Sequence, residues 1–251
     1  MTNSDIMYHI GLRSSDGAMA AIICGDPARV EKIARLMDNP EFVASKREYT
    51  TWSADLDGER VLVTSHGIGG PSTAICLEEL HMIGVDTVIR VGTCGGMAHD
   101  VKTGDLVIAQ SAIRAEGTSR EYLPIEFPAS AHFDVISALR DAAEAEEKPY
   151  HIGTVHCKDS FYGQHSPERM PVSDELLSKW KAWIDGGCLA SEMETAALFT
   201  VSATLGIRSG AVLRAVWNQE RVNMGIIDAD DNDELSAARC AVEAMKILIN
   251  K

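Results

Sequence analysis

Hydrophobic and polar positions alternate between two kinds of segment along this chain. Short continuous apolar runs predict buried strands, and they fall at residues 18–24, 87–91, 106–109, 152–157 and 210–217. Apolar residues at steps of three and four predict amphipathic helices, and these fall at residues 29–37, 72–82, 133–146, 194–205 and 234–250. Because strand-like and helix-like segments follow one another, the pattern favours an α/β fold.

The segments between these elements contain one clear hairpin signal and two long irregular stretches. Asp57-Gly58 predicts a tight turn between strands at residues 49–56 and 60–65. Residues 158–174 and 218–233 show no apolar period and are expected to be loops. Loops of this length in a compact domain are often functional, and mobile surface loops are the alternative.

Composition narrows the class of protein. The 251 residues are 45% apolar and 24% charged, which is the balance of a folded globular chain. Their number fits a single domain, expected to span residues 1–251. With 23 basic and 37 acidic residues the formal net charge is −14, which repels nucleic-acid backbones and argues against nucleic acid as a partner. Any anionic substrate therefore needs a local cluster of arginines.

The cysteines and the apolar runs indicate the cellular compartment in which the protein is expected to fold. The six cysteines are widely spaced and form no CxxC pair, so they are expected to be reduced, buried thiols of a cytoplasmic protein. The apolar run 18–24 is far shorter than a membrane helix, and Asp5, with no basic residue before it, argues against a signal peptide. The eight histidines show no metal-ligand spacing.

The first candidate site follows the first predicted strand. Gly25-Asp26-Pro27-Ala28-Arg29 joins a glycine turn to a helix, with Asp26 as the expected N-cap and Pro27 at the first helical position. Free N–H groups and the positive end of the helix dipole favour an anion there. A cation in the first turn is unfavourable for the helix itself, so Arg29 suggests anion binding. An ordinary capped turn with a surface arginine is the alternative.

The second candidate is an arginine inside an apolar strand. A buried guanidinium without a partner costs several kcal/mol, so Arg90 must meet a carboxylate or a ligand anion. The glycines that follow it let a ligand approach the backbone, and Thr93 adds a hydroxyl. Open α/β sheets bind ligands at the carboxyl ends of their strands. Arg29 and Arg90 at two such ends favour a phosphate site over two separate salt bridges.

Two further motifs lie between predicted strands and helices. Gly67-Ile68-Gly69-Gly70-Pro71-Ser72 is an imperfect dinucleotide fingerprint, because Ser72 holds the third glycine position, although Asp86 lies near the place of a ribose-binding acid. In Glu192-Met193-Glu194, a carboxylate can accept both hydroxyls of a ribose diol. Helix N-terminal acids stabilised by the dipole are the alternative, which gives Met193 no role.

Taken in order, four motifs resemble the nucleoside phosphorylase-I family. They are Gly25-Asp26-Pro27-x-Arg29, Gly67-Ile68-Gly69-Gly70-Pro71-Ser72, Arg90-Val91-Gly92-Thr93 and Glu192-Met193-Glu194. The likeness runs from about residue 4 to the last helix. It implies a single-domain three-layer α/β/α sandwich with a mixed, partly barrel-like central sheet. It also implies a homohexamer, built as a trimer of dimers with shared active sites.

The resemblance implies reversible phosphorolysis, in which a nucleoside and phosphate give ribose 1-phosphate and a free base. By resemblance, phosphate is bound by Gly25, Arg29, Arg47, Arg90 and Thr93, with Arg47 lent by a neighbouring subunit. Ribose is bound by His9 of the neighbour and by Thr93, Met193 and Glu194. The catalytic residues are Arg90, Thr93 and Glu194. No cofactor is required, while a structural potassium ion at the dimer interface is matched by Glu48, Ile68 and Ser72.

The positions that meet the base favour uracil. Purine-cleaving relatives protonate the purine N7 with an aspartate, but the predicted strand delivers Asn218 at that place, and an asparagine cannot donate this proton. Phe161 and Gln164 match base-binding positions, with Gln164 as the family glutamine that pairs with uracil. The family arginine normally follows two residues later. Here the nearest one is Arg169, and Arg221 is the other candidate.

The resemblance therefore implies uridine cleavage in pyrimidine salvage, with deoxyuridine and thymidine left open as substrates. A purine nucleoside phosphorylase or a nucleosidase is the alternative within the family. Asn218 argues against both, and Arg29 with Arg90 argues against an enzyme that uses water. A non-catalytic nucleotide-binding module, resting on the glycines at 67–70 and on Asp86, is the alternative from another class. The expected ligands are uridine, phosphate, uracil and ribose 1-phosphate, without nucleic acid or membrane.

Overall fold

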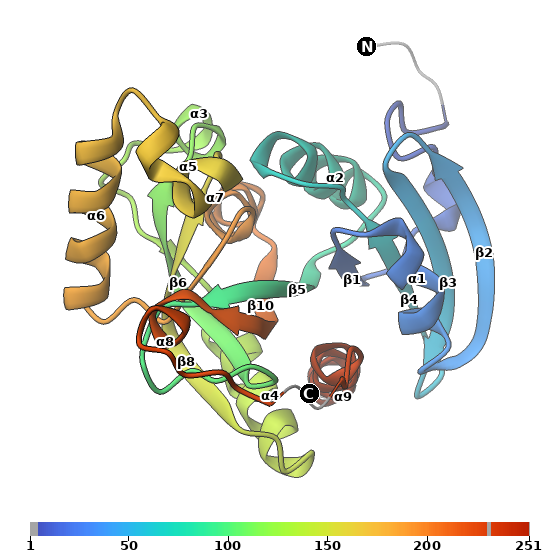
Figure 1. Ribbon diagram of the computed structural model, residues 1–251. Coiled ribbons are helices and arrows are strands. Elements are labelled where there is room, and N and C mark those ends of the chain that lie inside the picture. The colour runs from blue at the N-terminus through green and yellow to red at the C-terminus, as the bar shows by residue number, and fades with distance from the viewer. Residues whose placement is uncertain (1–4, 230–231, 251) are drawn as a thin grey trace.

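The computed structural model describes residues 5–229 and 232–250 (Figure 1). The strands are β1 (Ala20–Cys24), β2 (Asp38–Lys46), β3 (Tyr49–Leu56), β4 (Glu59–Ser65), β5 (Thr87–Gly96), β6 (Leu106–Ala115), β7 (Ala129–Ser130), β8 (Tyr150–Lys158), β9 (Ala190–Glu192) and β10 (Arg208–Asn218). The helices are α1 (Pro27–Ala34), α2 (Gly70–Met82), α3 (Thr118–Tyr122), α4 (Phe133–Ala145), α5 (Phe161–His165), α6 (Ser173–Asp185), α7 (Thr195–Leu205), α8 (Gln219–Asn223) and α9 (Ser236–Ile249). Short 3₁₀ turns are η1 (Ser14–Asp16) and η2 (Pro167–Arg169).

One mixed sheet contains these strands, and part of it closes on itself. β5 pairs with both β9 and β10, and β6 and β8 complete the ring between them. From β5 the sheet continues through β1, β4 and β3 to β2 as an open wing, on the right of Figure 1. β1 is parallel to β4 and β5, whereas β3 is antiparallel to β2 and β4. The predicted mixed, partly barrel-like sheet is confirmed.

Helices cover both faces of this sheet (Figure 1). On one face α2 and α7 bury Leu80 and Phe199 in one apolar cluster. On the other, α4 and α9 bury Leu139 and Met245 in a second cluster, which continues under α1. Because strands between two helical layers are buried on both faces, their sequences are continuous apolar runs. The three-layer α/β/α arrangement is confirmed.

Local signals placed the first helix and the hairpin correctly. Asp26 accepts a hydrogen bond from the N–H of Ala28 at 2.9 Å, and Pro27 begins α1. Asp57 and Gly58 have φ values of 52° and 87°, the left-handed region that such a turn requires between β3 and β4. Both elements therefore follow from side-chain chemistry within a few residues of chain.

Two predicted loops contain helices instead. Residues 158–174 form α5, η2 and the start of α6, and α8 occupies the start of 218–233, of which 230–231 lie outside the described residues. Ser160 accepts a hydrogen bond from the N–H of Gly163, and Asn218 accepts from those of the second and third residues of α8. These N-caps stabilise helices too short to show an apolar period, so the prediction was wrong there.

The glycines after Arg90 continue the strand, which was expected to end at Val91. β5 continues to Gly96 because β10 pairs with it along its whole length, with Trp217 opposite Gly95 and Asn218 opposite Gly96. A Cβ at position 96 would lie 2.6 Å from Asn218 Nδ2, and one at position 95 would lie 3.2 Å from Trp217 Nε1. Glycine is therefore required for the side chains of β10, and the expectation that the strand ends at Val91 was wrong.

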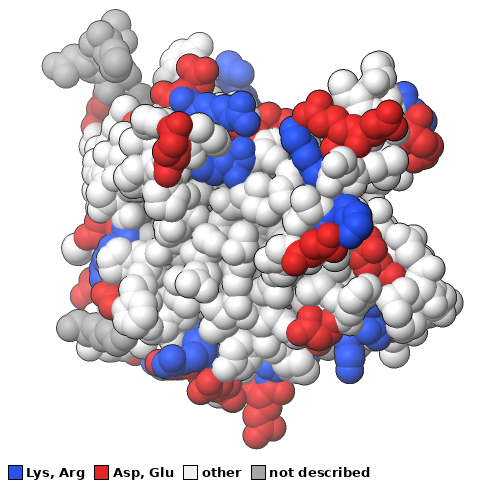
Figure 2. All heavy atoms as spheres, turned by 90° about the vertical axis from the view of Figure 1, so that its left-hand side faces the viewer, with Lys and Arg blue, Asp and Glu red and all other residues white. Residues whose placement is uncertain are grey.

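The surface and the thiols agree with a folded, acidic chain. Figure 2 shows acidic and basic side chains interspersed around a broad uncharged area on one face. All six cysteines are free and buried, as expected, and burial raises the pKa of Cys24 to about 12. Within residues 5–229 and 232–250, no helix has the length and apolar character needed to cross a membrane.

Candidate active site

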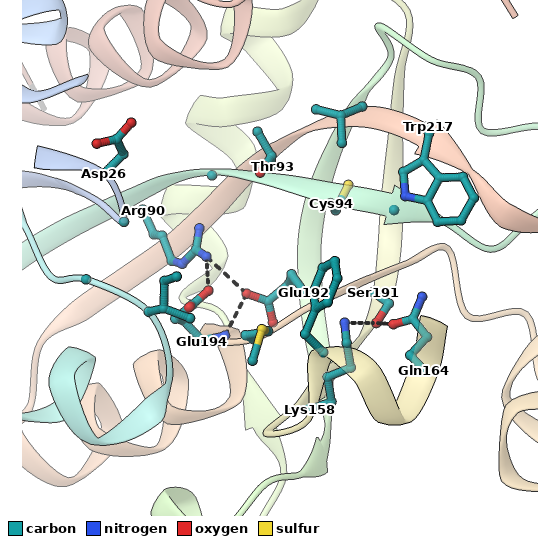
Figure 3. A pocket seen from close by; sticks show the side chains of 18 of the residues that line it. Asp26, Arg90, Thr93, Cys94, Lys158, Gln164, Ser191, Glu192, Glu194 and Trp217 are labelled. Atoms are coloured by element: carbon teal, nitrogen blue, oxygen red, sulfur yellow. Dashed lines mark hydrogen bonds and ion pairs between the residues drawn. The ribbon is translucent and has the colours of Figure 1, made fainter. Parts of the chain in front are cut away.

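A cavity of about 770 Å³ lies where several strands reach their carboxyl ends (Figure 3). It is lined by the loops that follow β1 and β4, by the second half of β5, and by the ends of β8, β9 and β10. Such strand ends are where open α/β sheets bind ligands. Nine residues expected at the site line it, namely Gly25, Arg29, Ile68, Arg90, Thr93, Phe161, Gln164, Met193 and Glu194.

Arg90 lies between two buried carboxylates in the wall of this cavity. Its Nη2 is 3.3 Å from Glu192 Oε2 and also pairs with Glu194 Oε2. Its Nε and Nη1 are buried without a hydrogen-bond partner among the described residues. A guanidinium carries five N–H donors, so several remain for an anion. A Cβ at Gly92 would collide with Arg90 Nη1, which explains the glycine.

Burial and these neighbouring charges also set the protonation states of Arg90, Glu194 and His66. Burial alone would lower the pKa of Arg90, but Glu194 and Glu192 outweigh burial and raise it. Burial alone would raise the pKa of Glu194, but the Arg90 guanidinium outweighs it and holds this pKa below its usual value. Burial, and then Arg90, lower the pKa of the neighbouring His66 to about 4. At neutral pH the cavity wall therefore contains a charged arginine and charged Glu194, with the neutral His66 buried behind them.

Backbone N–H groups hold both carboxylates. The N–H of Gly69 donates to Glu194 Oε1 at 2.7 Å. Glu192 accepts from the N–H groups of Glu194 and Thr195, each at 2.9 Å, and so caps the start of α7. Glu192 is therefore a helix-terminal acid, as the alternative interpretation has it, while Glu194 and the half-buried Met193 line the cavity, where binding of a ribose stays a prediction.

Three other expected phosphate residues, Gly25, Arg29 and Thr93, line the cavity together with Arg90. Cys24 pairs with Val91, so Gly25 follows β1 next to the part of β5 that contains Thr93. Arg29 in the first turn of α1 is half-buried, and no described carboxylate forms an ion pair with it. Two arginines and a helix N-terminus thus border one end of the cavity, which favours a bound anion. We call it the phosphate end.

The other end of the cavity contains a chain of hydrogen bonds that runs from a lysine ammonium through a hydroxyl to two amides. Lys158 Nζ, at the last residue of β8, donates to Ser191 Oγ at 2.8 Å. Ser191 Oγ donates to Gln164 Oε1 at 2.7 Å, and Gln164 Nε2 donates to Gln219 Oε1 at 3.3 Å. Figure 3 shows Lys158, Ser191 and Gln164 grouped away from Arg90. We call this the base end.

Three aromatic rings border the base end. The Phe161 and His165 ring centroids lie 4.2 Å apart, and those of His165 and Trp217 lie 5.3 Å apart. All three residues line the cavity. The planes of neighbouring rings are inclined by 42° and 38°, and their faces and edges give an aromatic border against which a planar base can pack.

His9 and Arg47, expected from a neighbouring subunit, do not line the cavity of their own chain. His9 Nδ1 is 2.6 Å from Glu79 Oε1. Arg47 is exposed in the turn between β2 and β3, with a φ of 56°. Lys46 packs over the Tyr8 ring at 5.0 Å, so both expected residues lie on the same side of the wing.

The expected potassium residues lie next to this group. Ser72 Oγ donates to Glu48 Oε1 at 2.9 Å. Gly67 approaches the same carboxylate, since a Cβ there would lie 3.0 Å from Glu48 Cγ. Ile68 is 78% exposed and lies at the cavity rim. The fold thus brings together a carboxylate and a hydroxyl near the cavity mouth.

The two candidate arginines for the base lie outside the cavity. Arg169 is exposed at the end of η2, with its guanidinium 5.9 Å from the Tyr162 ring. Arg221 is bound to Asp228, with Nη2 at 2.6 Å from Oδ1. Neither lines the cavity in this chain, since Arg169 lies in η2 and Arg221, in α8, is held by Asp228.

Asn218 is also outside the cavity. Its Nδ2 donates to the carbonyls of Ala98 and Val101 at 2.7 and 2.8 Å, and its Oδ1 caps α8. The amide nitrogen and the amide oxygen of Asn218 are therefore both hydrogen-bonded to the backbone. The cavity wall at this end of β10 is instead formed by Val216 and Trp217.

Sequence reasoning missed several lining residues, notably Lys158, Ser191, His165 and Trp217. Lys158 had a readable signal, since it ends an apolar strand just as Arg90 interrupts one. Ser191 had none, because its role depends on β9 lying beside β8, with Ser191 opposite His156. His165 lies in a stretch that was expected to be a loop, whereas Trp217 lies in a predicted strand whose neighbours the sequence does not show.

Comparison with known proteins matches the chain over almost its whole length. The family described as the Phosphorylase superfamily matches residues 20–249. The chain is 51% identical over 249 residues to a uridine phosphorylase of Treponema pallidum, covering 99% of this chain and 96% of that protein. It is 39% identical over 254 residues to a uridine phosphorylase of Escherichia coli, covering 99% and 100%. A guanosine phosphorylase of Halorubrum lacusprofundi is 38% identical over 242 residues, covering 96% of each.

Proposed function

We propose that this chain, which belongs to the phosphorylase superfamily, catalyses the reversible phosphorolysis of uridine to uracil and ribose 1-phosphate. The observation that carries the proposal is one cavity with an arginine-lined anion site at one end and a buried amide, Gln164, at the other. The full-length likeness to uridine phosphorylases supports the same reaction.

In this proposal the phosphate end binds and orients the nucleophile. Arg90 uses its unpaired Nε and Nη1, and Arg29 and Thr93 add further donors. Glu194, kept ionised by Arg90, accepts the ribose hydroxyls while Met193 packs against the sugar. As the bond to the base breaks, positive charge develops on the sugar, and both phosphate and Glu194 stabilise it.

The base end supports uracil over a purine. An amide offers one donor and one acceptor, so Gln164 can pair with a carbonyl and the neighbouring N–H of uracil. Among the described lining residues the acids are Asp26, Glu192 and Glu194, and none of them belongs to the base end. A purine leaving group that requires protonation at N7 therefore has no acid beside it.

Phosphate dependence and a nucleoside panel test this proposal. Uridine, thymidine, deoxyuridine, cytidine, inosine and adenosine are each incubated with the protein, with and without phosphate, and base release is followed by ultraviolet absorbance. We expect uridine to be cleaved only with phosphate. Faster cleavage of inosine would identify a purine phosphorylase, release without phosphate would identify a nucleosidase, and binding without any release would identify a nucleotide-binding module.

We also propose that the enzyme is a hexamer, a trimer of dimers, whose sites are shared between subunits. His9 and Arg47 support this, since they lie together on the wing but outside their own cavity. The exposed apolar side chains of Tyr8 and Phe42 lie on the same wing. Mixing Arg47→Ala with Glu194→Ala chains should restore activity, because a mixed dimer holds one intact site. Zero activity despite demonstrated subunit exchange would refute sharing.

The oxygen donors beside this region support a potassium ion at the dimer interface. Glu48 and Ser72 supply a carboxylate and a hydroxyl, which are the hard ligands that alkali cations prefer, and Ile68 can add a carbonyl. The ion would contribute structure rather than chemistry. A melting temperature higher in potassium than in tetramethylammonium chloride, with the difference abolished in Ser72→Ala, is the expected result.

The thiols support a cytoplasmic location for this reaction. Each of the six is free and buried, as in a chain that folds in a reducing compartment. Treating the folded protein with an oxidant and counting free thiols after unfolding should still find all six.

A further inference from the structure

Lys158 is a buried cation that the phosphate end does not use. Only 7% of its surface is exposed, and it lines the base end of the cavity. Its Nζ donates to Ser191 Oγ at 2.8 Å, and no described carboxylate forms an ion pair with it. An ammonium has three N–H donors, so two are not engaged by described side chains or backbone.

This arrangement lowers the stability of the folded protein. A buried charge without an ion-pair partner is destabilising unless its hydrogen bonds are satisfied. Burial accordingly lowers the pKa of Lys158, while Glu192 acts in the opposite direction. An apolar side chain could fill this position without the cost of burying a charge. The cavity that it lines offers a ligand as the missing partner.

We propose that the Lys158 ammonium binds a carbonyl oxygen of the base and stabilises the negative charge that uracil acquires as it leaves. This rests on the proposed function. The position follows from the hydrogen-bond chain, because Ser191 joins Lys158 to Gln164, the amide expected to pair with uracil. Lys158 thereby supplies the cationic donor that neither Arg169 nor Arg221 brings to this cavity.

The step balances without further reactants. The bond between ribose C1′ and uracil N1 breaks, and its electron pair moves to the uracil ring, where N1 and the carbonyl oxygens share the charge. A phosphate oxygen forms the new bond to C1′. Lys158 keeps its proton and acts through charge and hydrogen bonding, and the released uracil anion takes its proton from water.

The test compares leaving groups. Lys158→Met removes the charge and leaves an unbranched side chain that is shorter by one atom. Removing one donor to a developing anion costs on the order of 10²-fold in kcat, and we expect such a loss for uridine. For 5-fluorouridine, whose base is more acidic and needs less stabilisation, we expect a clearly smaller loss. The KM for phosphate should be unchanged, because Arg90 and Arg29 are intact.

Lys179→Met is the matched control, since Lys179 is an exposed lysine of α6 that pairs with Glu175. It should leave both substrates unaffected. An equal loss of kcat on uridine and 5-fluorouridine in Lys158→Met would indicate a structural role and overturn the proposal, as would no loss. If Lys158→Met does not fold, Lys158→Gln, which retains a hydrogen bond to Ser191, makes the same comparison.

Failure of the two proposals can be told apart with the wild-type protein. If it does not release uracil from uridine with phosphate, the proposed function is wrong and the role of Lys158 falls with it. If it does, and Lys158→Met shows no leaving-group effect, only the role of Lys158 is wrong.

Discussion

The two ends of the cavity are built in different ways. At the phosphate end Arg90, Glu192 and Glu194 form charged pairs, supported by backbone N–H groups at the starts of α2 and α7. At the base end Gln164 and Gln219 form neutral amide contacts, and both belong to short helices, α5 and α8. The first end rests on the central sheet, and the second rests on connections between its strands.

This difference suggests a division of roles, in which the phosphate end serves the reaction and the base end serves the choice of base. Charged pairs in a buried site leave an uncompensated charge when one member is removed, so the phosphate end tolerates little change. Neutral hydrogen bonds carried by short helices can be exchanged at lower cost. The predictions below test this division from the largest expected effect to the smallest.

Arg90→Ala should have the largest effect. It leaves Glu192 and Glu194 buried without a counter-charge, which costs about 3–5 kcal/mol of unfolding free energy, and it removes the phosphate contact. We expect loss of phosphorolysis and a lower denaturant midpoint. Arg140→Ala, which removes an exposed pair with Asp141, should change neither measurement. Near-normal activity with an unchanged KM for phosphate would contradict the assignment of Arg90.

Acid should lower the stability of the protein, because a buried neutral histidine lies beside each end of the cavity. Burial lowers the pKa of His66 at the phosphate end to about 4 and that of His156 at the base end to about 3, from 6.5. Between pH 6.5 and these values only the unfolded chain binds the proton. Stability therefore falls as pH falls, by about 1.4 kcal/mol per pH unit for each histidine.

Denaturant unfolding at several pH values checks this slope. His66→Gln and His156→Gln should each remove about one histidine's share of it, while His99→Gln, at an exposed position, should leave it unchanged. A slope that is undiminished in both single variants would mean that other groups cause the acid sensitivity.

Gln164→Ala should affect the base and leave phosphate alone. Losing its pairing with uracil should lower kcat/KM for uridine by roughly one to two powers of ten, or about 1–3 kcal/mol. Steady-state kinetics with each substrate varied separates the two ends. Gln110→Ala, at an exposed position of β6, is the control. A change in the KM for phosphate as large as that for uridine would show that the ends are not independent.

Gln219→Ala should have the smallest effect. Gln219 accepts from Gln164 over 3.3 Å and does not line the cavity, so it positions the amide without touching the base. One neutral hydrogen bond is worth about 0.5–1.5 kcal/mol, so we expect a loss of up to about tenfold in kcat/KM for uridine. A loss equal to that of Gln164→Ala would show direct contact with substrate.

The sequence indicated the phosphate end better than the base end, for a physical reason. A cation in an apolar strand, such as Arg90, is conspicuous because burial of a charge demands a partner. The same reasoning applies to Lys158. Gln164 was identified only by resemblance, since an amide in an irregular stretch has no such signature. Asn218 was read as a residue facing the base, but its amide instead holds the backbone at Ala98 and Val101.

The sequence by itself determined the alternation of strands and helices, the cap at Asp26 and the hairpin at Asp57-Gly58, because these depend on neighbours within a few residues. Only the tertiary structure decided that β5 closes a ring with β10, which requires Gly95 and Gly96 and carries the strand past Arg90. It also decided which polar residues meet in the cavity, because such contacts join segments of chain up to 125 residues apart. The number of residues between two such segments does not show how close they lie in the folded protein.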